Sequence, residues 1–548
     1  MERREQMYPR LTDAQISRIS DVGQHRSIRV GELLFEPGDR NGDLFLVISG
    51  GIEIVRPVAG REEPITVLGP GQFTGEINML SARVTLARAR VVAQGSVVAL
   101  DRDGIRAVVQ RDPELSEILL RAFLLRRGAL ISQAENDLVL LGSRHSLGTL
   151  QIKEFLTRNG QPFTYHDVEN EPGVQALLDR LQIGVNEVPV IVCEEGYVYR
   201  NPSIEALSAE LGLTPDLDAK AVRDVVIVGA GPAGLGAAVY AASEGLDVLI
   251  LESTAPGGQA GTSSRIENYL GFPTGISGLA LAGRALTQAE KFGAEVAIAR
   301  SAVRFNCDQR PYQVHLSDGE VVQARTIVIA TGARYRKLDV PGLSRFEGAG
   351  IFYSATHLEA HGCKDEEIAV VGGGNSAGQA AVFLSGIASR VHVVVRGRTL
   401  ADSMSRYLIQ RIENSRNLEL RTRTRIEKLE GDGRLERVHW RQVETQAAET
   451  RPIRNLFVMT GAEPNTAWLK GCVVLDDKNF VKTGSDLQPE ELAEARWALS
   501  RRPYLMETSI PGVFAVGDVR SSSFKRVASA VGEGSICVQL IHQVLQEL

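Results

Sequence analysis

The sequence predicts a multidomain chain with a small β-barrel or jelly roll at its N-terminus, a short α/β segment in its middle and two βαβ units in its C-terminal half. Residues 24–110 carry short alternating or apolar segments separated by turns rich in glycine and proline, the pattern of a small all-β domain. Residues 138–212 alternate between strand-like and helix-like periods. From residue 224 onward, two strand–helix–strand segments follow one another, which is the order of a parallel sheet covered by helices.

Length and composition support several ordered domains. The chain has 548 residues, of which 43% are hydrophobic and 23% charged, so large apolar cores are expected and disorder is not. Its formal charge of −6 argues against a nucleic-acid partner. The N-terminus lacks a signal-peptide pattern and no run approaches ~18 apolar residues, so we expect a cytoplasmic protein without a membrane span. Five cysteines without a C-x-x-C motif exclude a disulfide scaffold and a zinc ribbon, which predicts a reduced chain and no metal site.

A helical pattern begins at Asp112–Pro113, directly after the predicted barrel. Its apolar residues fall on one helical face: Leu115, Ile118, Leu119, Ala122 and Phe123. This stripe can pack on the barrel of its own chain or on a second copy, and the sequence leaves both open.

The middle segment is predicted to contain four strands and three helices in about 75 residues, too few for a dinucleotide-binding unit. The strands are Leu138–Leu141, Pro162–Val168, Pro189–Cys193 and Tyr197–Arg200, and the helices are 149–158, Val174–Leu181 and Ser203–Leu211. Leu213–Asp218 then has the composition of a linker.

The first βαβ unit carries a glycine-rich loop, Gly229–Gly234, between the strand Asp224–Val228 and the helix 233–244. These glycines permit a tight turn and let backbone N–H groups approach a pyrophosphate at the helix N-terminus. Glu252 follows the second strand, where a carboxylate can hold a ribose hydroxyl. The unit is therefore predicted to bind a dinucleotide.

The second unit carries Gly372–Ala377 between the strand Ile368–Val371 and the helix 376–386. At the place of the first unit's acid, this unit has Arg396 and Arg398. Arginine suits the 2′-phosphate of NADPH. If both arginines are instead solvated surface charges, NADH is possible.

A third signal lies near the C-terminus. The apolar strand in Thr508–Asp518 ends in Gly517-Asp518, which places a carboxylate where it can bond a ribityl hydroxyl. We expect Gly532–Gly534 to open the last helix, with its positive end toward a flavin.

Together these motifs resemble the low-molecular-weight thioredoxin reductase family, which are FAD- and NADPH-binding pyridine nucleotide-disulphide oxidoreductases. The matching segments are Gly229–Gly234, Gly257–Gln259, Glu267–Asn268, Ala330–Gly332, Gly372–Ala377, Gly461–Asn465 and Gly517–Asp518. The resemblance implies a homodimer with Rossmann-like FAD (222–337 and 461–548) and NAD(P)H (338–460) domains. It implies FAD contacts from Gly229, Gly231, Pro232, Ala233, Gly234, Glu252, Gly258, Gln259, Asn268, Ala330, Thr331, Gly332, Gly517, Asp518, Arg526 and Val527. The implied NADPH contacts are Gly372, Gly374, Asn375, Ser376, Ala377, Arg396 and Arg398.

The chain departs from this family at its redox centre. Ser354 and His357 stand where the family has the cysteines of Cys-Ala-Thr-Cys, and a hydroxyl and an imidazole cannot cycle between dithiol and disulfide. His357 either exchanges a proton beside the flavin or is a packed residue at a vacated site. The later cysteines Cys363, Cys472 and Cys537 are predicted to be buried or inert thiols rather than replacements.

The middle segment (135–213, followed by a linker at 214–221) resembles the thioredoxin fold, glutaredoxin-like in length. Val188-Pro189 matches the family's Val-Pro, in which the proline is cis, and the loop Gly142–Leu147 stands where the family has its redox cysteines. Since this loop has no cysteine, the resemblance implies a redox-silent domain for docking or binding.

The N-terminal segment (1–134) resembles the cyclic-nucleotide-binding domain through Phe73–Leu80 and Arg83. The resemblance implies that Gly75 and Glu76 lie at the ribose and that Arg83 pairs with the cyclic phosphate. Val84 replaces a helping hydroxyl, so the domain either binds a cyclic nucleotide or is a structural barrel.

These predictions lead to an oxidoreductase that passes electrons from NADPH through FAD to an acceptor other than a dithiol, such as a quinone, a ferredoxin-like protein or oxygen. Two alternatives stay open. One is a disulfide reductase using another or a partner-supplied thiol, and the other is a non-catalytic flavin-bound sensor of redox state or cyclic nucleotide.

Overall fold

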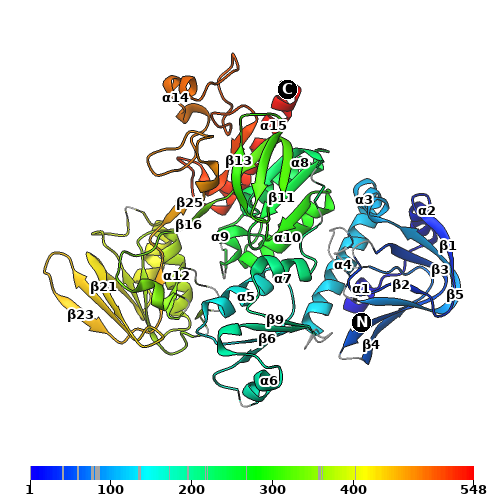
Figure 1. Cartoon of the computed structure of the whole chain (residues 1–548), viewed down its shortest axis with the longest axis horizontal. Coiled ribbons are helices and arrows are strands. Elements are labelled where there is room, and N and C mark those ends of the chain that lie inside the picture. The colour runs from blue at the N-terminus through cyan, green and yellow to red at the C-terminus, as the bar shows by residue number, and fades with distance from the viewer. Residues whose placement is uncertain are drawn as a thin grey trace.

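Figure 1 shows the chain as a computed structural model, with the N-terminal β-domain and the β21–β23 sheet on opposite sides of a central α/β body. The structure describes residues 2–39, 42–58, 61–75, 79, 85, 87–133, 138–171, 173–193, 197–215, 217–218, 220–263, 265–266, 268–347, 349–353, 355, 359–360, 362–401 and 403–547. Among these, no helix is both long and apolar enough to cross a membrane.

The N-terminal domain is an antiparallel β-structure, as predicted. Its elements are α1 (Glu2–Met7), α2 (Asp13–Ser20), β1 (Gln24–Ile28), β2 (Leu33–Phe35), β3 (Leu44–Val58), β4 (Arg61–Leu68), β5 (Arg88–Leu100), α3 (Arg102–Arg111) and α4 (Pro113–Gln133). The strands follow the order β1-β5-β3-β4, with β2 on β5. Four stripe residues of α4 are buried in the core of this barrel and Ile118 is partly buried against it. The helix therefore packs on the barrel of its own chain, which answers the question that its sequence left open.

The middle segment contains every element expected from its sequence. These are β6 (Leu138–Gly142), α5 (Leu147–Arg158), β7 (Thr164–Asp167), α6 (Val174–Arg180), the short η2 (Val185–Glu187), β8 (Val190–Cys193), β9 (Val198–Arg200) and α7 (Ile204–Glu210). The sheet order is β7-β6-β8-β9, in which β7 is parallel to β6 and the other pairs are antiparallel. The Val188–Pro189 peptide bond is cis.

This segment shares a hydrophobic core with the α/β body that follows it. Ile152 and Phe155 of α5 belong to the same buried cluster as Ile298 and Ala299 at the end of strand β12 (Glu295–Ile298). The buried Thr214 hydroxyl also donates to the Ile298 carbonyl, at 2.5 Å. Because burial of shared apolar area holds the two parts together, the segment is packed against the α/β body and is not joined to it by the linker alone.

The first βαβ unit lies in a seven-stranded sheet of order β12-β11-β10-β15-β14-β13, with β26 on β15. Its elements are β10 (Val222–Val228), α8 (Pro232–Ser243), β11 (Val248–Glu252), α9 (Gly258–Gly261), α10 (Gly278–Lys291), β13 (Ala302–Asn306), β14 (Tyr312–Leu316), β15 (Val321–Ile329), β26 (Val513–Ala515) and α15 (Val527–Glu547). Alternate residues of β10 face opposite sides. Val225 and Ile227 pack in the cluster that contains α8 and α15, and Val226 packs on the other side with β14.

The second unit forms a parallel sheet of order β17-β24-β18-β19-β20, joined by a three-stranded sheet β21-β22-β23. Its elements are η3 (Leu343–Phe346), β17 (Ile351–Phe352), β18 (Glu367–Val371), α12 (Asn375–Ser385), β19 (Arg390–Val394), α13 (Arg406–Glu413), β20 (Leu418–Arg421), β21 (Thr424–Glu430), β22 (Arg437–Gln442), β23 (Ala448–Arg451) and β24 (Leu456–Val458). The chain enters and leaves it through β16 (Ala333–Tyr335) and β25 (Ala462–Pro464), which pair antiparallel.

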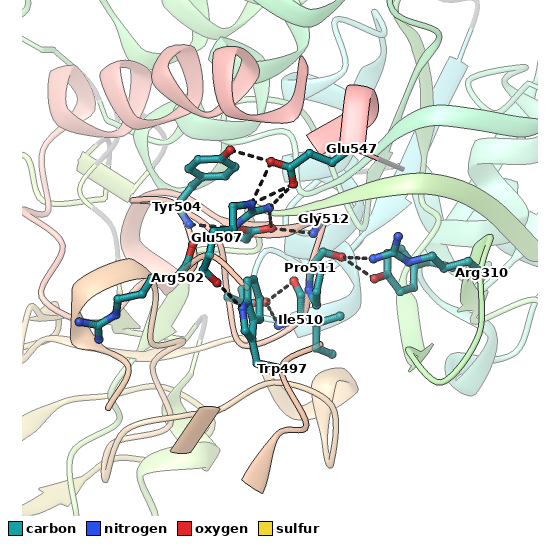
Figure 2. Close-up of polar contacts among 12 residues, drawn as sticks. Arg310, Trp497, Arg502, Tyr504, Glu507, Ile510, Pro511, Gly512 and Glu547 are labelled. Carbon is teal, nitrogen blue, oxygen red and sulfur yellow. Dashed lines mark hydrogen bonds and ion pairs between the residues drawn. The ribbon is translucent and has the colours of Figure 1, made fainter. Parts of the chain in front are cut away.

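The connection from β25 to β26 contains η4 (Ala467–Leu469), η5 (Gly484–Asp486) and α14 (Pro489–Glu494). Figure 2 shows how it is anchored: Glu507, fully buried, accepts hydrogen bonds from the Tyr504 and Gly512 amides, both at 2.9 Å. Arg501 neutralises this carboxylate through Nη1 at 2.6 Å and also pairs with Glu547 of α15. Since a buried charge is tolerated only when it is paired and hydrogen-bonded, this cluster fixes the connection on the last helix.

Two predictions about this half of the chain are wrong. The last helix begins at Val527 rather than at Gly532, and Gly534 lies inside it, where a Cβ would be 2.2 Å from the Ala233 carbonyl oxygen. That glycine therefore permits close packing of α15 on α8. Cys472 is not a free thiol, because it forms a disulfide with Cys307, 165 residues away.

Candidate nucleotide-binding site

Both glycine-rich loops open into one continuous cavity of about 3260 Å³, well above the roughly 300–1,000 Å³ of a pocket for one small ligand. Of the predicted FAD contacts, all but Gly234 line it, and of the predicted NADPH contacts, all but Ala377 and Arg398 do. None of the described lining residues is a cysteine. The cavity thus brings together two glycine-rich loops from segments far apart in the sequence.

The first loop requires glycine at its start. Gly229 has a φ of 108°, and a Cβ there would lie 2.4 Å from the carbonyl oxygen of Ala330, at the end of the neighbouring strand. A Cβ at Gly234 would lie 1.9 Å from the Gly229 carbonyl oxygen. The absent side chains let α8 begin directly at the end of β10, which points the amides of its first turn at the cavity.

Glu252 ends β11 with its carboxylate at the base of this loop. It is 8% exposed and accepts from the Ala230 amide at 2.8 Å, and from the Thr254 and Ala255 amides at 2.9 and 3.2 Å. The carboxylate therefore organises the loops on both sides of it, and it lines the cavity where a ribose hydroxyl could reach it.

The C-terminal part of the site is held by a buried ion pair. Glu533 accepts from the Gly517 amide at 2.7 Å and from Arg520 Nη2 at 2.7 Å. This fixes the turn that carries Asp518, η6 (Gly517–Val519). Burial raises the pKa of Asp518, an effect that nearby Lys525 opposes, and burial lowers the pKa of Lys525.

The second loop repeats the geometry of the first. Gly372 has a φ of 147°, and a Cβ there would lie 2.2 Å from the Met459 carbonyl oxygen after β24. The Asn375 side chain accepts from the Ser405 amide at 2.7 Å. Arg396 is exposed and lines the cavity, and it is therefore the better placed of the two predicted arginines.

A third wall, which the sequence did not predict, comes from the middle segment. It consists of the loop after β6 and one face of α5: Arg144, His145, Leu147, Leu150, Gln151, Lys153, Glu154 and Arg158. Burial lowers the pKa of Lys153, whose ammonium lies 3.7 Å from the Tyr165 ring centroid. The polar positions at helical spacing on α5 marked an exposed face, but nothing local indicated that this face borders the nucleotide loops.

The residues predicted for the redox centre and the cyclic-nucleotide site fall largely outside the described part of the chain. This holds for Ser354, His357, Glu76, Arg83 and Val84, and for Glu267 of the family match. Tyr353 and Ala355, on either side of Ser354, line the cavity.

Gly75 is described, with a φ of 104°, and its carbonyl accepts from Arg126 Nη1 of α4 at 2.7 Å. Burial lowers the pKa of Arg126 to about 10. This buried guanidinium joins the loop at Gly75 to the helix that leaves the barrel.

None of the free cysteines Cys193, Cys363 and Cys537 is among the residues that line the cavity. Cys363 and Cys537 are both fully buried, and burial raises the pKa of each. Within the described ranges, no group of three or more His, Cys, Asp or Glu residues could hold a metal ion.

Residues 223–534 match the family model "Pyridine nucleotide-disulphide oxidoreductase", which is more than half of the chain. The chain belongs to this family. It is 31% identical over 329 residues to the thioredoxin reductase of Bacillus subtilis, covering 60% of this chain and 96% of that one. It is 33% identical over 314 residues to that of Mycolicibacterium smegmatis, covering 57% and 93%. Thioredoxin reductases of this family use FAD and NADPH.

Solved structures agree with this membership. The thioredoxin reductase of Lactococcus lactis in its FR conformation matches with a TM-score of 0.53 and 28% identity, covering 60% of this chain and all of that one. That of T. acidophilum matches with a TM-score of 0.52 and 29% identity, covering 59% and 98%. Residues 25–112 match the cyclic nucleotide-binding domain model, so this family member carries such a domain ahead of its oxidoreductase part.

Proposed function

We propose that the protein is an NADPH-dependent FAD oxidoreductase that delivers electrons to an acceptor other than a dithiol. One observation carries this proposal: two dinucleotide loops open into one cavity whose described lining contains no cysteine. FAD, when bound, would accept a hydride from NADPH and release the electrons to the acceptor. The residues of the chain bind and orient the two nucleotides and shield them from water.

The first loop fits FAD because its glycines form a cradle that a Cβ would fill. We assign the Gly229–Gly234 loop, the Glu252 carboxylate and the turn at Asp518 to FAD. We assign the remaining FAD contacts implied by the family resemblance to the same cofactor. The domain division follows, with an FAD domain at 222–337 and 461–548 and an NADPH domain at 338–460. The paired β16 and β25 support the placement of the two connections.

The second loop fits NADPH, and Arg396 is the side chain proposed to meet its 2′-phosphate. A guanidinium forms charge-assisted hydrogen bonds to phosphate, and Arg396 lines the same cavity as Gly374 and Asn375. Arg398 is absent from the described lining, so it is assigned no contact.

The middle segment is proposed to be a thioredoxin-type domain that has lost its redox function. Its strand order, with β7 parallel to β6 and the other pairs antiparallel, supports the fold. The loop that would carry the dithiol contributes Arg144 and His145 to the cavity and has no cysteine. Because the segment shares a core with the FAD unit, we propose that it forms a fixed wall of the site instead of a moving relay.

The cyclic-nucleotide-type barrel is proposed to modulate this enzyme through α4. Neighbouring arginines of this helix contact both sides: Arg126 donates to the Gly75 carbonyl at 2.7 Å, and Arg127 Nη2 donates to the Gly160 carbonyl of the middle segment at 3.3 Å. A nucleotide that moves the Gly75 loop would therefore bias the helix that also contacts the middle segment.

Anaerobic rapid mixing of the holoprotein with NADPH tests the proposal. We expect bleaching of the flavin absorbance, followed by reoxidation with a quinone, a ferredoxin-like protein or oxygen, in the presence and absence of cyclic AMP and cyclic GMP. Absence of bleaching would contradict both enzymatic hypotheses and favour the non-catalytic sensor. Reoxidation by a protein disulfide in the wild type, lost in Cys307→Ser/Cys472→Ser, would favour the disulfide reductase alternative, to which the Cys307–Cys472 bridge directs attention. If cyclic nucleotide changes the bleaching rate of the wild type, we next test Arg127→Ala. A variant that still binds the cyclic nucleotide but bleaches at the same rate with and without it would support coupling through α4.

A further inference from the structure

The C-terminal end of α5 in the middle segment forms hydrogen bonds to the 254–258 loop of the predicted FAD domain. Arg158 Nη2 donates to the carbonyl oxygens of Ala255 and Gly258, both at 3.0 Å. Asn159 Nδ2 donates to the carbonyl oxygen of Thr254 at 3.1 Å. Two consecutive side chains thus bind three carbonyls of one short loop, which directly follows Glu252.

This loop is held from its other side by Glu252 itself. The Thr254 and Ala255 amides donate to the Glu252 carboxylate, while the Thr254 and Ala255 carbonyls accept from the middle segment. After Pro256, Gly257 and Gly258 have positive φ values of 102° and 51° and no side chains to fix them. The conformation of the loop therefore depends on partners outside it.

Arg158 is well fixed for this role. Its side chain is 13% exposed, and Nη1 pairs with Glu154 one turn earlier at 3.1 Å. Phe155, between them on α5, is fully buried in the core that the middle segment shares with Ile298 and Ala299. The buried Phe155 fixes α5 against the FAD unit, and the Glu154 pair restricts the arginine side chain, so its guanidinium is preorganised against the loop.

We propose that Arg158 is a positioning residue for FAD: it holds the 254–258 loop beside the ribose-binding carboxylate in the conformation that receives the cofactor. The inference rests on the assignment of this loop to FAD. Arg158 lies outside the family match at 223–534. The alignment with the Bacillus subtilis relative already covers 96% of that protein, which leaves it little sequence for an equivalent domain. The middle segment would thus complete a cofactor site that such relatives build from the oxidoreductase part alone.

FAD affinity of the full-length protein tests the proposal. Apoprotein prepared from the wild type, Arg158→Ala and Arg158→Lys is titrated with FAD by flavin fluorescence, and the visible circular dichroism of the bound flavin is recorded. We expect Arg158→Ala to raise the dissociation constant at least tenfold and to change the dichroism, and Arg158→Lys to restore part of both. Arg180→Ala, which removes an exposed arginine at the end of α6, is the matched control and should behave as the wild type.

Wild-type affinity and dichroism in a folded Arg158→Ala protein would overturn the proposal. If that variant does not fold, Arg158→Met decides, because it keeps an unbranched apolar stem and removes every donor to the Ala255 and Gly258 carbonyls; we expect a severalfold loss of affinity, and an unchanged affinity would overturn the proposal. These readouts do not depend on turnover. A wild type that binds FAD but is not bleached by NADPH would contradict the proposed function alone.

Discussion

The two glycine-rich loops of the cavity share one backbone conformation at their first glycine but contact different side chains. In each, the first glycine has a positive φ and approaches a carbonyl oxygen of the neighbouring strand so closely that a Cβ is excluded, at Gly229 and at Gly372. Beyond that, the first loop is held by a buried carboxylate, Glu252, which accepts from the Ala230 amide, and Arg158 holds the neighbouring 254–258 loop. The second faces an exposed arginine, Arg396.

The shared features are those that let a loop approach a pyrophosphate. The features that differ are those expected to decide whether the nucleotide stays bound. Close backbone approach is common to both loops, since both must present amide groups at a helix N-terminus. A buried carboxylate that accepts from the loop distinguishes the first loop, as expected for a resident cofactor. An exposed arginine just after β19, Arg396, distinguishes the second, as expected for a nucleotide that must enter and leave in each cycle.

Replacing Gly229 or Gly372 by alanine should have the largest effect on nucleotide binding. Backbone strain alone costs about 1–3 kcal/mol, and the clash adds to it. We expect Gly229→Ala to lose its flavin, measured as flavin absorbance per chain, and Gly372→Ala to keep the flavin but lose bleaching by NADPH. Gly245→Ala separates strain from clash, because Gly245 has a φ of 87° with no atom near a Cβ. Similar losses in all three variants would contradict the distinction.

Loss of the Cys307–Cys472 bridge should have the next largest effect, and it should act on the first unit. The bridge closes a 165-residue span that encloses the whole second unit. A disulfide of this kind contributes about 2–4 kcal/mol, chiefly by restricting the unfolded chain. Denaturant unfolding with and without dithiothreitol should show this loss, as should Cys307→Ser/Cys472→Ser. Cys193→Ser serves as the control, and a transition indifferent to reductant would mean that the bridge does not form in solution.

Replacing Arg396 should affect only the second unit. Removal of one charge-assisted phosphate contact costs on the order of 1.5–3 kcal/mol, so Arg396→Ala should raise KM for NADPH roughly tenfold or more and leave KM for NADH nearly unchanged. Steady-state kinetics with both nucleotides measures this. Arg398→Ala is the matched control, and equal effects on NADPH and NADH would remove the assignment of Arg396.

Replacing Cys363 should change activity least. Burial raises the pKa of this thiol to about 12, above its ordinary value, so the thiol stays protonated and unreactive through neutral pH and loses its proton only as the pH approaches that value. The pH profiles of NADPH-driven bleaching should therefore coincide for the wild type and Cys363→Ala between about pH 6 and 9. A profile that loses an ionisation in the variant would identify Cys363 as a redox thiol.

Much of the fold could be predicted because its signals are local. The strands and helices around Gly229 and Gly372 follow from apolar periodicity and glycine spacing, and the elements of the middle segment follow from changes of period. The predicted start of the last helix is wrong because a glycine pair indicates a helix start in local sequence, whereas Gly534 lies inside the helix and permits close contact with α8. That role depends on Ala233, some 300 residues away in the chain.

By itself, the sequence determined the two glycine-rich turns between strand and helix and predicted roles for Glu252 and Arg396, because these depend on residue types a few positions apart along one strand and helix. Only the tertiary structure decided which surfaces meet. Arg158 reaches Gly258 across 100 positions, and Cys307 reaches Cys472 across 165. Such contacts arise from the burial of shared apolar cores, which brings distant segments together without leaving a mark in local sequence. The third wall of the cavity and the disulfide are therefore properties of the packing.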